Sequence, residues 1–327
     1  MPSHFGLSSV LDLIGHTPLI HLRRISAEAG ADIYGKCEFQ NPGLSVKDRI
    51  ALYIIEEAER SGQLKPGGVI VEGTAGNTGI GLALVAAVKG YRMILVIPNT
   101  MSKEKIDMVK AYGAELHLVE RKPWGDPQHY NTIAERIARE TPGAVWANQF
   151  HNLANRRCHQ TTTGPEIWEQ TEGRVEVLFG GMGTGGTLAG AGRFLKERNP
   201  KIKTIAVDPY GSVYYNYFKT GEQKAEGSSI VEGVGIGKVP GNYDGGVIDD
   251  IIRVDDTSAV RMTRRLVREE GMMLGGCSGL VTAGALLWLK ENPRINNAVA
   301  ILTDSGRNYL SKLFNDDWLR GQNLPLD

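Results

Sequence analysis

Short apolar runs alternate with helical patterns along most of the chain, and this alternation limits the possible folds more than any other feature. Strands that are apolar on both faces occur in parallel sheets that helices cover on both sides. The pattern therefore predicts an α/β fold. Its first cycle consists of predicted strands at residues 69–71, 93–97 and 116–119 and predicted helices at 77–89 and 103–112.

A second cycle follows further along the chain, with strands predicted at 175–179 and 204–207 around a helix at 188–197. With 327 residues, the chain should hold about two domains. Residues 212–250 are glycine-rich and lack apolar periodicity, so we expect a long irregular segment that could close over a site. Further helices are predicted at 50–60, 132–140, 257–270 and 280–289, and further strands within 8–22 and at 33–39 and 299–302.

The composition argues against several classes of function. The chain has 37 basic and 37 acidic residues, so no net charge attracts nucleic acid or an anionic membrane. Its three cysteines lack the spacing of a disulfide framework or a metal site. The N-terminus has no secretory pattern, and no run reaches the roughly 18 apolar residues of a spanning helix. We therefore expect a cytoplasmic protein with free thiols, no metal and a small-molecule partner.

Lys47 lies in a polar run that follows the turn signal at residues 41–43 and precedes a predicted amphipathic helix. Ser45 and Asp48 have capping-box spacing, which predicts that this helix begins here. On this local pattern alone, Lys47 would be a solvated residue of the first helical turn.

Two glycine-rich turns change the interpretation of Lys47. Residues 73–79 and 180–187 each follow an apolar strand and open a predicted helix. Because the N-terminus of a helix binds anions, the chain should build two anion-binding helix ends. A lysine combined with such turns points to a phosphorylated carbonyl cofactor and to Lys47 as a covalent catalyst.

A nicotinamide dehydrogenase is the rival interpretation. Residues 181–186 match the dinucleotide pattern GxGxxG, and Asp208 ends the next strand about twenty residues later. Two features oppose it. Asp208 is followed at once by Pro209, and Gly185 widens the turn into a nest suited to one phosphate rather than a pyrophosphate. Glycines that serve only close packing are the structural alternative.

Four motifs occur in order along the chain: Ser-Val-Lys-Asp-Arg around Lys47, Thr-Ala-Gly-Asn-Thr-Gly at 74–79, Gly-Thr-Gly-Gly-Thr at 183–187 and Gly-Gly-Cys-Ser-Gly at 275–279. Together they resemble the pyridoxal-phosphate enzymes of the cysteine synthase (O-acetylserine sulfhydrylase) and cystathionine β-synthase family. The resemblance covers nearly the whole chain.

This resemblance implies fold type II, in which two three-layer parallel-sheet domains enclose the site in a cleft. It implies a smaller, mobile α/β domain at 48–155. The larger domain, which binds the cofactor phosphate, would consist of 1–47 and 156–327. A homodimer is also implied.

The resemblance assigns roles to individual residues. Lys47 would form the Schiff base with pyridoxal 5'-phosphate, and Asn77 would hydrogen-bond the ring hydroxyl. The phosphate would be held by Gly183, Thr184, Gly185, Gly186 and Thr187. The substrate would be bound by Thr74, Ala75, Gly76, Thr78, Gln149 and Gly233.

Two positions depart from the family pattern. Ala75 stands where a serine is usual, which removes a hydroxyl near the substrate carboxylate. Cys277 aligns with the serine that faces the pyridine nitrogen, and Ser278 lies beside it as the alternative contact. A thiol is a weaker hydrogen-bond partner than a hydroxyl. Relatives with cysteine at this place include serine dehydratases, so β-elimination remains an alternative activity.

We expect β-replacement on an activated serine, foremost the cysteine synthase reaction of O-acetylserine with sulfide. Cystathionine synthesis from serine and homocysteine comes second, because residues 304–309 resemble cystathionine β-synthase. Elimination, dehydrogenation and an inactive scaffold follow. The glycine-rich run 233–237 is the predicted lid, and His16, His151 and His159 are predicted to be structural or surface histidines.

Overall fold

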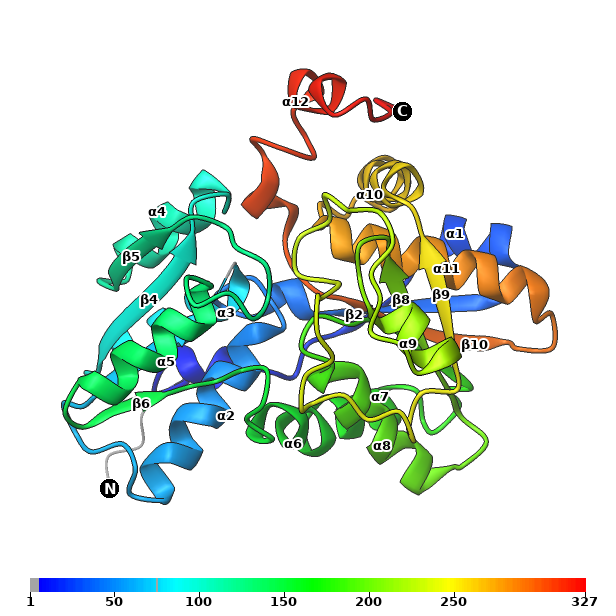
Figure 1. The fold of residues 1–327 in the computed structure, drawn as a ribbon. Helices are drawn as coiled ribbons and strands as arrows, with labels where there is room; N and C mark the ends of the chain where they lie inside the picture. The colour runs from blue at the N-terminus through cyan, green and yellow to red at the C-terminus, as the bar shows by residue number, and fades with distance from the viewer. Residues whose placement is uncertain (1–5, 75) are drawn as a thin grey trace.

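The computed structural model describes residues 6–74 and 76–327, which form two sheets with helices on both faces of each (Figure 1). This arrangement confirms the predicted α/β class with parallel-sheet domains. Within the described residues, no helix has the length and apolar character that a membrane crossing requires.

The larger sheet has six strands in the order β1-β2-β10-β7-β8-β9. Five of them run parallel, whereas the short edge strand β1 pairs antiparallel with β2, which the sequence pattern did not indicate. The strands are β1 Leu19–His21, β2 Asp32–Cys37, β7 Val177–Gly181, β8 Lys203–Pro209, β9 Asp250–Val254 and β10 Asn297–Leu302.

Side chains of alternate strand residues enter the cores on opposite faces of this sheet. Val177 and Phe179 pack on the side of α1 Arg23–Ala29, α10 Asp256–Glu270 and α11 Gly276–Glu291. Leu178 packs on the other side, with the helices α7 Thr163–Gln170, α8 Gly186–Arg198 and α9 Tyr214–Thr220. Each such buried side chain contributes about 1.5–3 kcal/mol. Burial on both faces explains why the strands are continuously apolar.

The smaller sheet has four parallel strands in the order β5-β4-β3-β6. The strands are β3 Val69–Gly73, β4 Arg92–Pro98, β5 Glu115–Val119 and β6 Ala144–Trp146. Helix α5 Tyr130–Glu140 covers one face, and α2 Lys47–Arg60, α3 Asn77–Lys89 and α4 Lys103–Ala111 cover the other. The whole sheet falls within 48–155, although the domain boundaries and the mobility of this part stay predictions.

Helix α6 Ala154–Thr161 lies between the two parts of the molecule and packs against α2 and α8 (Figure 1). Helix α12 Asp316–Gly321 ends the chain, and three short 3-10 turns complete the fold: η1 Val10–Leu13, η2 Glu38–Gln40 and η3 Gly306–Tyr309. The sequence analysis missed several elements: α1, α6, α7, α12, β6 and β9. It was also wrong to treat 212–250 as wholly irregular, because that segment contains α9.

Candidate active site

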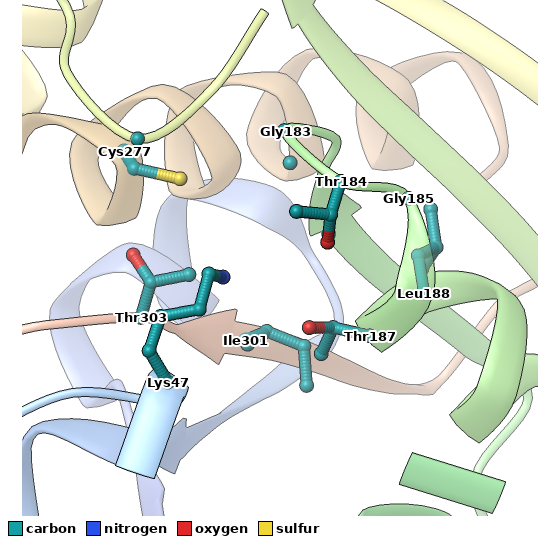
Figure 2. A pocket seen from close by; sticks show the side chains of 12 residues that line it. Lys47, Gly183, Thr184, Gly185, Thr187, Leu188, Cys277, Ile301 and Thr303 are labelled. Carbon is teal, nitrogen blue, oxygen red and sulfur yellow. The ribbon is translucent and has the colours of Figure 1, made fainter. Parts of the chain in front are cut away.

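A pocket lies at the carboxyl ends of β7 and β10, where α2 meets the second glycine turn (Figure 2). This edge of a parallel sheet is where α/β folds bind ligands. Seven residues predicted to belong to the site line the pocket: Lys47, Gly183, Thr184, Gly185, Thr187, Gly233 and Cys277.

The start of α2 is tied to the end of β10, and this connection directs Lys47 into the pocket (Figure 2). The Val46 N–H donates to the Thr303 carbonyl at 2.9 Å, and the Ser305 N–H donates to the Leu44 carbonyl at 3.1 Å. Leu44 turns the chain with a φ of +67°. A left-handed conformation costs a leucine about 1–3 kcal/mol, so tertiary contacts must hold this turn.

The predicted capping box is wrong, although the helix does begin here. The N-cap is Val46, which makes no side-chain capping bond. The Asp48 carboxylate instead accepts a hydrogen bond from the Gly43 N–H at 2.5 Å, and Ser45 Oγ accepts one from the Lys47 N–H at 3.2 Å. Asp48 is completely buried, and its side chain pairs with a backbone N–H of the preceding turn rather than with one at the helix end.

The environment of Lys47 favours an uncharged amine. Burial lowers the pKa of Lys47, while the nearby acidic groups of Cys277, Asp304 and Glu38 act in the opposite direction. A lysine must be uncharged to attack a carbonyl or to accept a proton.

The second glycine turn brings bare backbone to the other side of the pocket. Gly185 is the N-cap of α8 and has a φ of +81°. At Gly183, a Cβ atom would lie 2.7 Å from the Gly233 carbonyl oxygen. Larger residues would therefore not fit in this turn. The exposed backbone N–H groups and the N-terminus of α8 are suited to binding an anion.

Asp208 does not have the environment that a dinucleotide site requires. Its carboxylate is completely buried and accepts a hydrogen bond from the Tyr215 N–H at 3.0 Å. Burial raises the pKa of Asp208 to about 7, although hydrogen bonds from Ser212 and Tyr215 lower it. The acid is therefore used to hold the start of α9.

The first glycine turn forms a separate group on the side of the smaller sheet. Asn77 Nδ2 donates to Asp304 at 2.7 Å, and the Thr78 hydroxyl donates to Gln149 Oε1 at 2.5 Å. Thr74 Oγ1 accepts from the Gly76 N–H at 3.2 Å. None of these six residues lines the pocket of Figure 2, although Thr303, the neighbour of Asp304, does. Ala75 lies outside the described residues.

The structure distinguishes the positions of Cys277 and Ser278. Cys277 lines the pocket, whereas Ser278 is completely buried and its Oγ accepts a hydrogen bond from the Thr303 N–H at 3.0 Å. Burial raises the pKa of Cys277 to about 11, although a hydrogen bond with Thr303 lowers it. The thiol is therefore protonated at neutral pH.

A buried polar network behind the first glycine turn was not predicted. The Tyr309 hydroxyl donates to Asp304 at 2.6 Å. Lys105 of α4 donates to the Tyr309 hydroxyl at 2.9 Å and pairs with Glu232 at 2.8 Å. Glu232 precedes Gly233, so the network joins the predicted lid to the smaller sheet. No local pattern marks Lys105, because an amphipathic helix commonly carries lysines.

Within residues 6–74 and 76–327, no three or more His, Cys, Asp or Glu side chains are grouped so that they could hold a metal ion.

Comparison with known proteins places these features in a family. The family model described as "Pyridoxal-phosphate dependent enzyme" matches residues 10–304. Cysteine synthase 1 of Emericella nidulans is 44% identical over 97% of this chain and 87% of its own length. Cystathionine beta-synthase of Apis mellifera is 43% identical over 96% of this chain and 62% of its own length. The crystal structure of O-ureido-L-serine synthase, at 38% identity, has a TM-score of 0.87 and covers 97% of this chain and 100% of that chain.

These matches span nearly the whole chain and include the segment with Lys47 and both glycine turns. The chain therefore belongs to the family of pyridoxal-phosphate-dependent enzymes, and pyridoxal phosphate is its cofactor.

Proposed function

We propose that this protein catalyses β-replacement on an activated serine and acts as a cysteine synthase, converting O-acetylserine and sulfide into cysteine and acetate. One observation carries the proposal. Lys47 lines the same pocket as the glycine turn at the N-terminus of α8, and burial lowers the pKa of this lysine. An uncharged lysine and an anion-binding helix end are the groups that pyridoxal phosphate requires. Similarity to cysteine synthase 1 of Emericella nidulans supports this choice of substrates.

The residues of the pocket fit the cofactor. A Cβ atom at Gly183 would meet the Gly233 carbonyl, so only bare backbone leaves space in this turn. Lys47 would hold the cofactor covalently, and Asn77 would contact its ring hydroxyl. The phosphate would be bound by Gly183, Thr184, Gly185, Gly186 and Thr187.

When bound, pyridoxal phosphate withdraws electrons from the substrate Cα. Lys47, once a substrate amine has taken its place, removes the Cα proton and later returns it. The lowered pKa supports this role, because it increases the fraction of uncharged amine that can accept a proton. Acetate leaves Cβ with its bonding electron pair, and sulfide supplies the pair for the new carbon–sulfur bond.

The first glycine turn is our proposed binding site for the substrate carboxylate, with Thr74, Ala75, Gly76, Thr78 and Gln149. The 2.5 Å bond between Thr78 and Gln149 supports this, because it fixes both side chains before substrate arrives. Gly233, with a φ of +83°, lies in the run 233–237, which is the proposed lid.

Cystathionine synthesis is the second candidate, and one observation favours it. The run 304–309 is similar to that of cystathionine β-synthases, and in this chain it contacts Asn77 through Asp304 and α4 through Tyr309. Similarity to cystathionine beta-synthase of Apis mellifera points the same way.

One assay separates these functions. Purified protein is given O-acetylserine, O-phosphoserine or serine, each with sulfide and with homocysteine. We expect the highest rate for O-acetylserine with sulfide, measured as cysteine. Faster formation of cystathionine from serine and homocysteine would establish the second candidate, and release of pyruvate alone would establish β-elimination.

Gly185→Leu should weaken cofactor binding by at least about 10-fold. A Cβ atom at position 185 would lie only 3.2 Å from the Cα of Tyr243, so the leucine would push the turn away from Tyr243. The measurement is a titration of apoprotein with pyridoxal phosphate. Gly221→Leu is the matched control, since Gly221 has the same φ of +81° with open space around it. Equal affinities of the two variants would contradict the assignment.

Cys277→Ser should preserve folding and alter either the absorbance of the bound cofactor or the ratio of replacement to elimination. The reason is that a hydroxyl forms a stronger hydrogen bond than a thiol with the pyridine nitrogen that Cys277 is proposed to face. Ser278→Ala is the companion variant, because Ser278 bonds to Thr303 instead. If only Ser278→Ala changes the spectrum, Ser278 makes the contact.

The proposal extends to a cytosolic homodimer in which the part at 48–155 closes on the part formed by 1–47 and 156–327. The separate sheets support a moving smaller part. Exposed apolar side chains support a dimer surface near the N-terminus, at Leu7, Val10, Leu13 and Ile20. Analytical ultracentrifugation measures the oligomeric state.

A further inference from the structure

Helix α6 contacts the second glycine turn from behind. Asn155 and His159 lie four residues apart, so they share one face of the helix. Both side chains are buried, and each forms a hydrogen bond with one threonine of the turn, Thr184 or Thr187. The hydroxyl oxygens of both threonines are directed into the pocket, on the side that Lys47 faces (Figure 2).

Asn155 fixes the direction of the bond to Thr184. Its Nδ2 lies 2.9 Å from the Gln149 carbonyl oxygen, which can only accept, so the amide nitrogen must be on this side. The same Nδ2 donates to Thr184 Oγ1 at 3.0 Å, and the Gly186 N–H donates to that oxygen at 3.4 Å. With both lone pairs engaged, the Thr184 hydroxyl has only its proton left to offer.

His159 forms the corresponding bond to Thr187. Burial lowers the pKa of His159 well below its usual value, as does the charge of Arg49, so the ring is neutral with one N–H. Its Nε2 lies 3.1 Å from Thr187 Oγ1, and its Nδ1 lies 2.8 Å from Thr163 Oγ1. If Nε2 carries the proton, Thr187 accepts from the ring and its own proton is free. In the other tautomer, Thr187 would donate to the ring and present a lone pair to the pocket.

A phosphate dianion only accepts hydrogen bonds, so it is compatible with the first tautomer and not with the second. We propose that α6 sets the hydrogen-bond polarity of the phosphate site: Asn155 and His159 donate to Thr184 and Thr187, and both threonine hydroxyls therefore donate to the phosphate. His159 and Asn155 are positioning residues, because they act through the threonines. This inference rests on the proposed role of the second glycine turn.

The test compares pyridoxal phosphate with pyridoxal, which has the same aldehyde but no phosphate. Dissociation constants of both are measured by titrating apoprotein. His159→Leu should weaken the binding of pyridoxal phosphate by about 10-fold or more, since a hydrogen bond to a charged group contributes about 1.5–3 kcal/mol. The binding of pyridoxal should stay unchanged. His159→Gln restores an N–H donor and should recover part of the preference. Thr161→Ala, on the exposed side of α6, is the matched control and should behave as wild type.

A double-mutant cycle identifies the route of the effect. In a Thr187→Val background, His159→Leu should cause no further loss of preference for pyridoxal phosphate, because the hydroxyl through which it acts is gone. The inference would be overturned if His159→Leu weakened the binding of both ligands equally, or if the losses of preference for pyridoxal phosphate were additive in the cycle. His159 would then have only a packing role. If wild type itself shows no preference for pyridoxal phosphate, the phosphate site is wrongly assigned, and the inference is overturned with it.

Discussion

Lys47→Ala is expected to lose the borohydride-reducible link to the cofactor and to reduce turnover by about 10³-fold or more. Lys47 is proposed both to hold the cofactor and to move the Cα proton, so a single substitution removes two functions. The fold should persist, since alanine favours helices at the first position of α2 and the bonds that hold Leu44 and Val46 involve backbone atoms. Circular dichroism and a steady-state assay measure the two outcomes.

Lys103→Ala is the control for this experiment. Its side chain is exposed on α4, where it pairs with Asp107, and its loss should affect neither the link nor the rate. Peptide mapping after reduction locates the modified lysine. A reducible adduct on another lysine of the Lys47→Ala protein would contradict the assignment.

The strand and turn pattern predicted much of the fold because its signals are local. β7 and β8 are buried on both faces, which makes them continuously apolar, and Gly185 has the positive φ that glycine adopts most readily. The start of α11 was less visible: the helix begins at Gly276, whereas the pattern indicated a start at Leu280. Glycine, cysteine and serine are weak helix formers, so tertiary contacts determine this first turn.

Helix α6 shows why other elements could not be predicted. Its buried face carries Asn155, Cys158 and His159, so apolar periodicity does not mark it. Asn155 and His159 form hydrogen bonds with Thr184 and Thr187 of the second glycine turn, which lies in another part of the chain. His159 was predicted to be structural or on the surface, and it is completely buried.

Contacts between distant segments are the second limit of sequence analysis. Asn77 meets Asp304 across 227 positions, and Lys105 meets Glu232 across 127. No local pattern predicts such pairs, since they depend on how the two sheets are placed. The family resemblance indicated Asn77 through its motif, but it did not indicate the acid that Asn77 contacts.

Arg49, two positions after Lys47, also contacts residues that are distant in the sequence. Its Nε donates to Glu38 at 2.7 Å, and its two Nη atoms donate to Glu166 at 2.6 and 2.7 Å. Lys36 pairs with Glu166 at 2.6 Å. Lys36, Glu38 and Arg49 are buried, and the cluster joins β2, η2, α2 and α7 near the start of α2.

Arg49→Met should lower the free energy of unfolding by about 3–5 kcal/mol, because it leaves the completely buried Glu38 carboxylate without its closest cation. Urea denaturation at pH 7 measures the loss. Arg92→Met is the matched control: Arg92 forms an exposed pair with Glu115 at 3.4 Å, and such pairs contribute about 0–1 kcal/mol. Similar losses in both variants would show that the buried cluster does not stabilise the fold.

The pH dependence of stability tests the same cluster independently. Burial would raise the pKa of Glu166, but the hydrogen bonds and charges of Arg49 and Lys36 lower it to about 2. A carboxylate with a depressed pKa stabilises the fold above its unfolded value, near 4.5, and this contribution is lost as the pH falls toward 2. Arg49→Met should bring the pKa of Glu166 closer to its usual value, so the variant should lose less stability than wild type as the pH falls from 4.5 to 2. The difference in unfolding free energy between the two proteins should therefore narrow over this range. A difference that stays constant across this range would mean that the charge of Glu166 is not what Arg49 stabilises.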